Sequence, residues 1–209
     1  MRKIAIAIPS GDDVKANFAF ALCGLVAHSF RNLQKTQIAI ANKKGCLICL
    51  QRAALVEEAL ERGADYIFFL DSDMVFPPDT LERLLKHGFE TSIVGCAYST
   101  RCEPIHNTAQ DANGDIVVKR DDKGLKDVRR LATGCMLIPR SVFVCTPRPW
   151  FLTPHVEVEG VVGGRYLGED YYFCDKVRSQ GFPIYADLDL SREVQHEGNA
   201  RYDLVTDHG

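Results

Sequence analysis

The sequence predicts an α/β protein in which a mostly parallel sheet is flanked by helices and followed by a more irregular half. Short apolar segments alternate with segments of helical periodicity throughout residues 1–100. The apolar segment at 66–70 lacks polar alternation, as expected for a strand that is covered on both faces. Right-handed crossovers between such strands produce one largely parallel sheet. Residues 101–209 instead carry turn signals that are typical of hairpins and long loops.

Stop signals set the limits of the elements expected in the first half. The first strand stops at Pro9-Ser10-Gly11, and Gly63 closes the second helix as a C-terminal cap. Asp79 follows two prolines and begins a third helix, which Gly88 ends. We therefore expect strands at 3–8, 37–41, 66–70 and 92–96, and helices at 14–29, 44–62 and 79–88.

The second half has fewer regular elements. Asn113-Gly114-Asp115 precedes apolar residues 116–118 and predicts a hairpin. The remaining expectations are one or two strands within 128–138, a helix from Glu169 to about Gln180 that ends at Gly181, and a strand over 182–187. Because no linker or repeat separates the halves, residues 1–209 are expected to form a single domain.

Composition excludes several classes of protein. The 25 basic and 28 acidic residues leave a net charge of −3, which argues against nucleic-acid binding through broad phosphate neutralisation and against a polybasic membrane surface. No apolar run approaches the roughly 20 residues of a membrane helix, and the apolar N-terminal run is too short for a secretory signal. The eight cysteines are therefore expected to be reduced thiols in a cytoplasmic protein without a transmembrane segment.

Two cysteines at CxxC spacing are better explained by packing than by metal or redox chemistry. No second pair with zinc-site spacing accompanies Cys46 and Cys49. Both fall on one expected helical stripe with Ala53, Val56 and Leu60, so a core position is the favoured interpretation.

Two aspartates follow the most apolar of the expected strands. Asp71-Ser72-Asp73 lies at the carboxyl end of that strand, where open α/β sheets bind their ligands. Residues i and i+2 of an extended segment face the same side, so Asp71 and Asp73 can face one cation. Their oxygens suit Mg²⁺ or Mn²⁺, with phosphate oxygens and water completing the shell. A polar turn that caps backbone amides explains the two residues alone equally well.

The segment around these aspartates resembles the DxD region of GT-A-fold glycosyltransferases, in particular the small bacterial and viral members of the family-2-like group. The match runs over residues 68–77 and continues into a helix with Leu81, Leu84 and Leu85. Further similar segments follow in the expected order: 133–138 with 140–143, Pro149-Trp150-Phe151, Gly168-Glu169-Asp170 and His196-Glu197-Gly198. No single motif is specific, but the ordered set is, and the resemblance extends from Ile4 to Gly198.

The resemblance implies a GT-A, Rossmann-like fold, with a nucleotide-sugar half at residues 1–100 and an acceptor and catalytic half at 101–209. It implies a Mn²⁺ or Mg²⁺ ion held by Asp71, Asp73 and His196, and a general base at Asp170 with Glu169 beside the acceptor. The implied donor-binding residues are Pro9, Ser10, Gly11, Arg52, Asp71, Ser72 and Asp73, and the implied acceptor-side residues are Gly134 and Trp150.

Several of these residues have a structural interpretation as well. Glu169 and Asp170 could simply cap the N-terminus of a helix, and a lone histidine such as His196 is more often hydrogen-bonded than metal-bound. Trp150 is equally explained as a stacking platform for a sugar or as an anchor for its proline-rich loop. Residues 163–168 are either a mobile flap over the donor or a tight turn.

The implied activity is a metal-dependent transfer of a hexosyl or deoxyhexosyl group from a nucleoside-diphosphate sugar to a glycan, lipid-linked or protein acceptor, with inversion at the sugar carbon. Two alternatives stay open at this point. A haloacid-dehalogenase-type phosphatase would use Asp71 as nucleophile, although its motif usually lies on the first strand. A non-catalytic module would bind the nucleotide sugar without transferring it.

Overall fold

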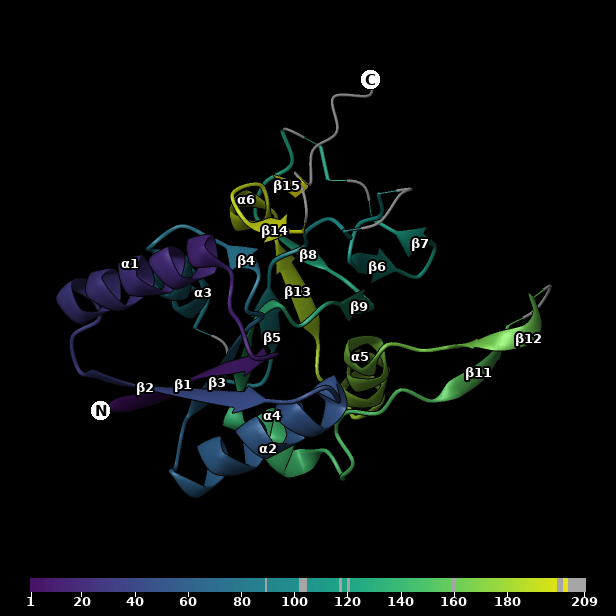
Figure 1. Ribbon diagram of the computed structural model, residues 1–209, viewed down its shortest axis with the longest axis horizontal. Helices are drawn as coiled ribbons and strands as arrows, with labels where there is room; N and C mark the ends of the chain where they lie inside the picture. The colour runs from purple at the N-terminus through teal and green to yellow at the C-terminus, as the bar shows by residue number, and fades with distance from the viewer. Residues whose placement is uncertain are drawn as a thin grey trace.

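The computed structural model describes residues 1–88, 90–101, 105–116, 118–119, 121–158, 161–198 and 201–202. Its first half alternates strands and helices as predicted: β1 (Arg2–Ser10), α1 (Ala16–Asn32), β2 (Thr36–Lys44), α2 (Ile48–Glu61), β3 (Tyr66–Leu70), β4 (Met74–Val75), α3 (Thr80–Lys86) and β5 (Ile93–Gly95). A central sheet runs through the molecule with helices on both sides (Figure 1).

The second half is built from short strands and short helices. They are β6 (Ala109–Asp111), β7 (Gly114–Asp115), β8 (Leu125–Asp127), β9 (Arg130–Leu131), β10 (Cys135–Pro139), α4 (Arg140–Cys145), β11 (His155–Val158), β12 (Val161–Tyr166), α5 (Glu169–Ser179), β13 (Ile184–Asp187), α6 (Leu188–Ser191), β14 (Gln195–Glu197) and β15 (Arg201–Tyr202). The predicted hairpin is present between β6 and β7, with its turn one residue earlier than expected. The strand expected after it includes Val117, which lies outside the described residues.

The central sheet has seven strands in the order β2-β1-β3-β10-β5-β13-β8. The strands β2, β1, β3, β5 and β13 share one direction, whereas β10 and β8 run antiparallel to their neighbours. The mostly parallel sheet flanked by helices is therefore confirmed. The expected strand at 128–138 separates into β9 and β10, and β10 lies in the middle of the sheet.

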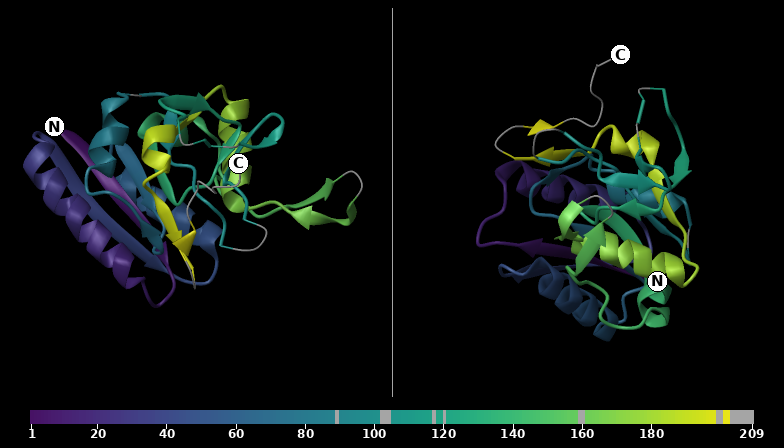
Figure 2. Two further views of the ribbon diagram at one scale, coloured as in Figure 1. Left: turned by 90° about the horizontal axis from the view of Figure 1, so that it is seen from above. Right: turned by 90° about the vertical axis from the view of Figure 1, so that its right-hand side faces the viewer.

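Two apolar layers cover the two faces of this sheet. Strand β3 sends Ile67 and Phe69 into one layer, with α2, α4 and α5, and sends Phe68 and Leu70 into the other, with α1 and α3. All five residues of β3 are buried. This burial on both faces is what the uninterrupted apolar sequence predicts. The views in Figures 1 and 2 show α1 and α2 on opposite sides of the sheet.

Three smaller sheets extend this core. A three-stranded sheet in the order β15-β14-β4 joins the C-terminal segment to the chain that follows β3, and a second contains β7, β6 and β9. The hairpin of β11 and β12 projects from the body beside α5 (Figure 1). It includes residues 163–166, so the segment expected to be a flap or a turn is mainly part of a β-strand.

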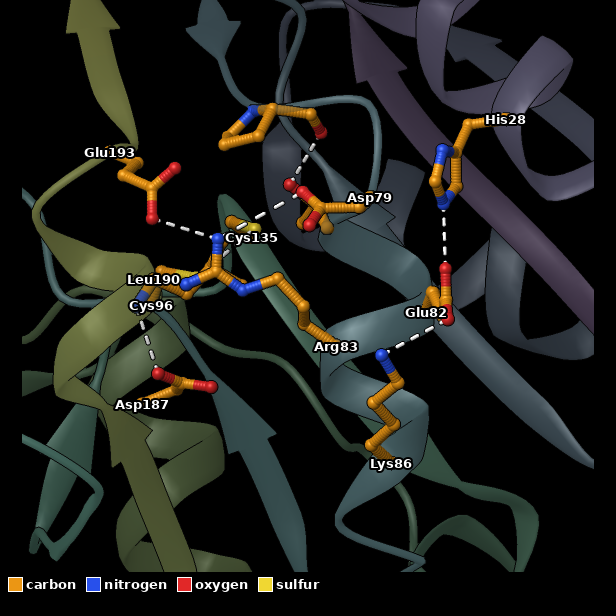
Figure 3. Close-up of polar contacts among 12 residues, drawn as sticks. His28, Asp79, Glu82, Arg83, Lys86, Cys96, Cys135, Asp187, Leu190 and Glu193 are labelled. Atoms are coloured by element: carbon orange, nitrogen blue, oxygen red, sulfur yellow. Dashed lines mark hydrogen bonds and ion pairs between the residues drawn. The ribbon is translucent and has the colours of Figure 1, made fainter. Parts of the chain in front are cut away.

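The C-terminal segment is also tied to α3 by charged contacts (Figure 3). Arg83 on α3 donates from Nη1 to Glu193 Oε1 at 2.8 Å. On the same helix, Glu82 accepts from His28 of α1 at 2.7 Å. Asp187 caps α6, because its Oδ1 accepts from the backbone N–H of Leu190 at 2.9 Å. The pair of Arg83 with Glu193 and the cap by Asp187 hold the chain that leads into β14, whereas the pair of Glu82 with His28 joins α3 to α1.

The starts of α1 and α2 lie later in the chain than expected. The second helix begins at Ile48 rather than near Lys44, because β2 pairs with β1 along its whole length, up to Ser10 opposite Lys44. Val14 precedes α1 and is exposed. Within the described residues, no helix combines the length and apolar character needed to cross a bilayer.

Gly95 of β5 has no room for a side chain. A Cβ atom there would lie 2.6 Å from the carbonyl oxygen of Cys135 on the neighbouring strand. We expect Gly95→Ala to lower the free energy of unfolding by about 1–3 kcal/mol, because the two strands would have to separate. The matched control is Gly24→Ala in α1, whose Cβ would make ordinary contacts with Pro78. Urea denaturation should show a neutral or stabilising effect for the control; equal stability of both variants would contradict this packing.

Candidate functional site

A cleft of about 890 Å³ lies at the carboxyl ends of β1 and β3. Its walls include the end of β1, the start of α2, the loop after β3, the chain after β5, the start of α5 and the segment of β14. The lining residues are Pro9, Ser10, Gly11, Lys15, Gly45, Cys46, Ile48, Gln51, Arg52, Asp71, Ser72, Asp73, Tyr98, Thr100, Arg101, Thr108, Ala132, Glu169, Asp170, His196 and Gly198. All the predicted donor-binding, catalytic and metal-binding residues are among them.

Arg52 is the most buried charged group of this cleft, with 3% of its surface exposed. Its guanidinium lies against the carboxylate of Asp71. Nη1 is 3.0 Å from Oδ1, and Nη2 donates to Oδ2 at 3.1 Å. Its Nε donates to Glu169 Oε1 at 3.1 Å. Burial alone would lower the pKa of Arg52, but the two carboxylates outweigh burial and raise it, so the guanidinium stays charged.

The contacts of Arg52 give it a structural role that the sequence did not predict. Its Nε donates to Glu169, and Nη1 and Nη2 lie beside the carboxylate of Asp71. The contact of Arg52 with the donor and that of Glu169 with the acceptor stay predictions, and both residues line the cleft. Arg52 therefore links the aspartate loop after β3 to the first turn of α5. Arg52 and Glu169 are 117 residues apart in the sequence.

Asp73 and His196 face each other on the opposite wall. Strand β14 pairs with β4 and places His196 opposite Met74. The backbone N–H of Glu197 also donates to the carbonyl of Asp73 at 2.8 Å. As a result, His196 Nε2 lies 3.5 Å from Asp73 Oδ1. Arg101 Nη1 donates to the other oxygen, Asp73 Oδ2, at 2.7 Å. Burial would raise the pKa of Asp73, but His196 and Arg101 together lower it.

The ring orientation of His196 bears on metal binding. Nδ1 lies 3.1 Å from the carbonyl oxygen of Ser99, which can only accept, so this hydrogen bond requires the proton on Nδ1. In the neutral ring the lone pair of Nε2 then faces the carboxylate of Asp73. Two electron-pair donors that face each other, with the histidine held by a backbone carbonyl, are what a divalent cation requires of its protein ligands.

The predicted three-residue ligand set is assembled only in part. Asp73 and His196 fit a cation, whereas the carboxylate of Asp71 is engaged by Arg52. Within the described ranges, the structure contains no group of three or more His, Cys, Asp or Glu that could hold a metal ion. Magnesium sites in nucleotide enzymes commonly use one or two carboxylates and complete the shell with phosphate oxygens and water. A two-residue set therefore suits a cation that binds together with a diphosphate.

Asp170 occupies the first turn of α5, in the floor of the cleft. Its Oδ1 accepts from the backbone N–H of Tyr171 at 2.7 Å, so it also has the capping role that the sequence allowed. Burial raises the pKa of Asp170 to about 7, with a further contribution from Glu169, although Arg52 opposes the shift. Gly168 is needed before it, because a Cβ there would lie 2.7 Å from Asp170 Oδ1.

Gly134 lies against the cleft without lining it. Its N–H donates to the hydroxyl oxygen of Tyr98 at 3.0 Å, and its carbonyl accepts from the N–H of Asp71 at 3.0 Å. A Cβ at this position would lie 2.3 Å from the Tyr98 oxygen and 3.0 Å from Asp71 Oδ2. The Tyr98 ring in turn packs edge-on against His196, with centroids 5.2 Å apart. Gly134 thus supports the aspartate loop, in place of the predicted contact with an acceptor.

Trp150 is a correction to the acceptor-side prediction. It is buried in the core, where its Nε1 donates to the carbonyls of Thr146 at 2.9 Å and Phe143 at 3.2 Å. Its ring packs edge-on against Phe143. Of the two interpretations given by the sequence, the structure favours the anchor over the stacking platform.

Cys46 is also placed differently from expectation. It precedes α2, is exposed and lines the cleft, whereas Cys49 packs partly against the core. The helical stripe therefore includes Cys49 but excludes Cys46, because the helix begins two residues after Cys46.

Several cleft residues were missed by the sequence analysis. Tyr98, Thr100 and Arg101 follow β5, at the carboxyl end of a strand that the sequence did predict. That position is the signal that could have identified them. Lys15, Gln51 and Thr108 are further polar side chains that were overlooked. Lys15 directly precedes α1, and Gln51 donates to the Ser10 carbonyl at 2.7 Å.

The double ion pair of Arg52 generates a prediction about stability. Arg52→Met leaves Asp71 and Glu169 in a buried site without their counter-charge, so we expect the free energy of unfolding to fall by about 2–4 kcal/mol in urea denaturation at pH 8. Arg62→Met is the matched control, because Arg62 also pairs with a glutamate, Glu58, but is 67% exposed. The control should lose less than about 1 kcal/mol. Similar losses in both variants would show that Arg52 has no special role.

Comparisons with known proteins agree with this fold and cleft. The family described as "Glycosyl transferase family 2" matches residues 51–145, which include Arg52 and the aspartate loop. The crystal structure of A197 from STIV superposes with a TM-score of 0.60 and 20% identity, covering 100% of this chain and 96% of that chain. At that identity the likeness concerns the fold alone. No curated protein matches the chain. Residues 51–145 are therefore similar to family-2 glycosyltransferases, and the chain as a whole has a fold of the GT-A type.

Proposed function

We propose that this protein transfers a sugar from a nucleoside-diphosphate sugar to an acceptor hydroxyl with the help of Mg²⁺ or Mn²⁺. The observation that carries the proposal is the convergence of Asp73, His196 and Asp170 from three distant segments into one cleft. A family-2 region covers the aspartate loop of that cleft. The implied partners are a sugar-nucleotide donor and a glycan, lipid-linked or protein acceptor, and the identity of sugar and base is left open.

The donor would bind between the end of β1 and the aspartate loop. Pro9, Ser10 and Gly11 would face the nucleoside, and Ser72 adjoins them on the cleft wall. Lys15 and Arg101 are the cleft cations nearest to solvent and suit phosphate oxygens. Asp73 and His196 would hold the cation, which when bound supplies positive charge for the departing diphosphate.

Asp170 would accept the proton of the attacking hydroxyl. A base with a pKa of about 7 is matched to neutral pH, since it is half ionised there and still attracts a proton. Arg52 and Glu169 would hold the helix terminus that carries it. A carboxylate base on the face opposite the leaving diphosphate corresponds to transfer with inversion.

The structure offers little support for the phosphatase alternative. A nucleophilic Asp71 needs a free carboxylate oxygen, but both of its oxygens are within 3.1 Å of Arg52 nitrogens. The strand before Asp71 is also the third of the chain. The non-catalytic module keeps the same cleft, so only the chemistry of Asp170 distinguishes it from an enzyme.

Thermal shift with a panel of nucleoside diphosphates and their sugars, with and without Mn²⁺, tests the donor site. We expect one nucleotide to raise the Tm, and Mn²⁺ to increase that shift. Asp73→Asn and His196→Ala should remove the Mn²⁺ contribution, whereas Arg101→Ala should keep it, because the guanidinium competes with the cation for Asp73. A shift that is unchanged by a chelator would contradict the metal role of Asp73 and His196.

Asp170→Asn tests the base. We expect turnover of the donor identified above to fall by about 10²–10⁴-fold, with donor affinity unchanged.

A carboxyl group with a raised pKa destabilises the fold as pH rises through about 7, so the variant should have a higher Tm than the wild type at pH 8 and a similar Tm at pH 4. In the wild type, kcat/KM should fall about tenfold per pH unit below 7.

The control for this variant is Asp127→Asn, an exposed aspartate that pairs with Arg178 outside the cleft. It should retain both turnover and the pH dependence of the wild type. If Asp170→Asn keeps wild-type turnover, Asp170 is not the base. If neither protein turns over any bound donor, the protein is a binding module.

A further inference from the structure

The outer face of α1 carries exposed apolar side chains that no part of the described chain covers. Phe20 is 80% exposed and Phe30 is 90% exposed. Together with Ala16, Cys23 and Ala27 they account for every exposed position of α1 before Arg31. We call these five residues the outer stripe. Figure 2 shows that α1 forms one flank of the molecule, away from α5 and the β11–β12 hairpin.

The spacing of the outer stripe is that of a helix–helix interface. Its members are separated by four, three, four and three residues, which is the heptad pattern that brings one helix against another. A helix face that is exposed only to solvent usually carries charged side chains, but the first charged residue of α1 is Arg31, in its last turn. The pattern of the outer stripe is therefore that of a face that packs against another helix.

The order of sizes in the stripe is self-complementary. If a second α1 lies antiparallel about a two-fold axis at Cys23, Phe30 of one copy falls opposite Ala16 of the other, and Phe20 falls within one residue of the level of Ala27. Each large ring thus meets a small residue, as packing of side chains into holes requires. A two-fold axis is also the commonest symmetry of protein dimers.

The area of the stripe suits a weak association. Burying four phenylalanine rings, two from each copy, removes about 700 Å² from water. That area lies at the low end for protein contacts, so the association of two copies is expected to be weak and to depend on concentration.

A lipid surface is a poorer occupant for this face. Helices that lie in a membrane interface combine an apolar face with many lysines and arginines. Helix α1 has one cation, Arg31, and the whole chain has a net charge of −3, which anionic lipids repel.

We propose that two copies of this chain associate through antiparallel packing of their α1 helices about a two-fold axis at Cys23. Lys15 lines the cleft and immediately precedes α1, so the cleft lies at the N-terminal end of the helix. Antiparallel packing then places the two clefts at opposite ends of the helix pair. The association is independent of the proposed transfer reaction.

Sedimentation equilibrium and cysteine cross-linking test the dimer. The full chain should reach twice its mass of 23.3 kDa as concentration rises. Phe20→Glu should weaken dimerisation by at least about tenfold. Val144→Glu is the matched control, because Val144 is 63% exposed on α4, outside the stripe, and it should leave the dimer unchanged.

In a variant with Cys46, Cys102 and Cys145 changed to serine, a thiol oxidant should link two copies through Cys23, and Cys23→Ser should abolish the link.

Ala27→Phe distinguishes the antiparallel dimer from a lipid surface and from any other pairing of the outer stripe. It should weaken the dimer, because the added ring meets Phe20 of the second copy, whereas on a lipid surface or in another pairing it would strengthen binding. Binding to anionic vesicles that increases in Ala27→Phe would overturn the proposal in favour of a membrane surface. A monomer at all concentrations, or a dimer that survives Phe20→Glu, would also overturn it.

Discussion

The buried guanidinium of Arg52 is the constraint on which the cleft depends. Its side chain contacts both the aspartate loop after β3 and the first turn of α5, through Asp71 and Glu169. The parallel sheet brings these segments to the same edge, but the sheet alone does not set the distance between them. Two charge-assisted hydrogen bonds, from Nε to Glu169 and from Nη2 to Asp71, set it together with the ion pair between Nη1 and Asp71.

The same guanidinium shapes the chemistry of Asp170. Three carboxylates, those of Asp71, Glu169 and Asp170, lie around one buried cation. Arg52 pairs directly with the first two, and Asp170 receives only a long-range share of its charge. Burial, the largest cause, and the neighbouring Glu169 therefore raise the pKa of Asp170 to about 7, and Arg52 offsets only part of this shift. This proton acceptor near neutrality comes at the expense of stability above pH 7.

The sequence was informative where a residue's role follows from its position along one element. Pro9 to Gly11, Asp71 to Asp73 and Asp170 all flank predicted strands or helices, and the structure places all of them in the cleft. Contacts between distant segments were not predictable in this way. Nothing local to Arg52 indicates that it pairs with a glutamate 117 residues later. The start of α2 was misplaced for a related reason, because pairing with β1 extends β2 beyond its apolar residues.

The charges of the cleft also explain the pairing of Arg101 with Asp73. Four carboxylates line the cleft, against the cations Arg52, Arg101 and Lys15, and Arg52 is already neutralised by its two partners. A diphosphate that entered this cleft would be repelled by Asp73 unless a cation bound between them. On the proposed function, Asp73 and His196 would hold that cation, which would supply positive charge beside the phosphates. Arg101, an exposed and permanently charged side chain, would then be available to the leaving group, so binding of the cation and binding of the diphosphate would favour each other.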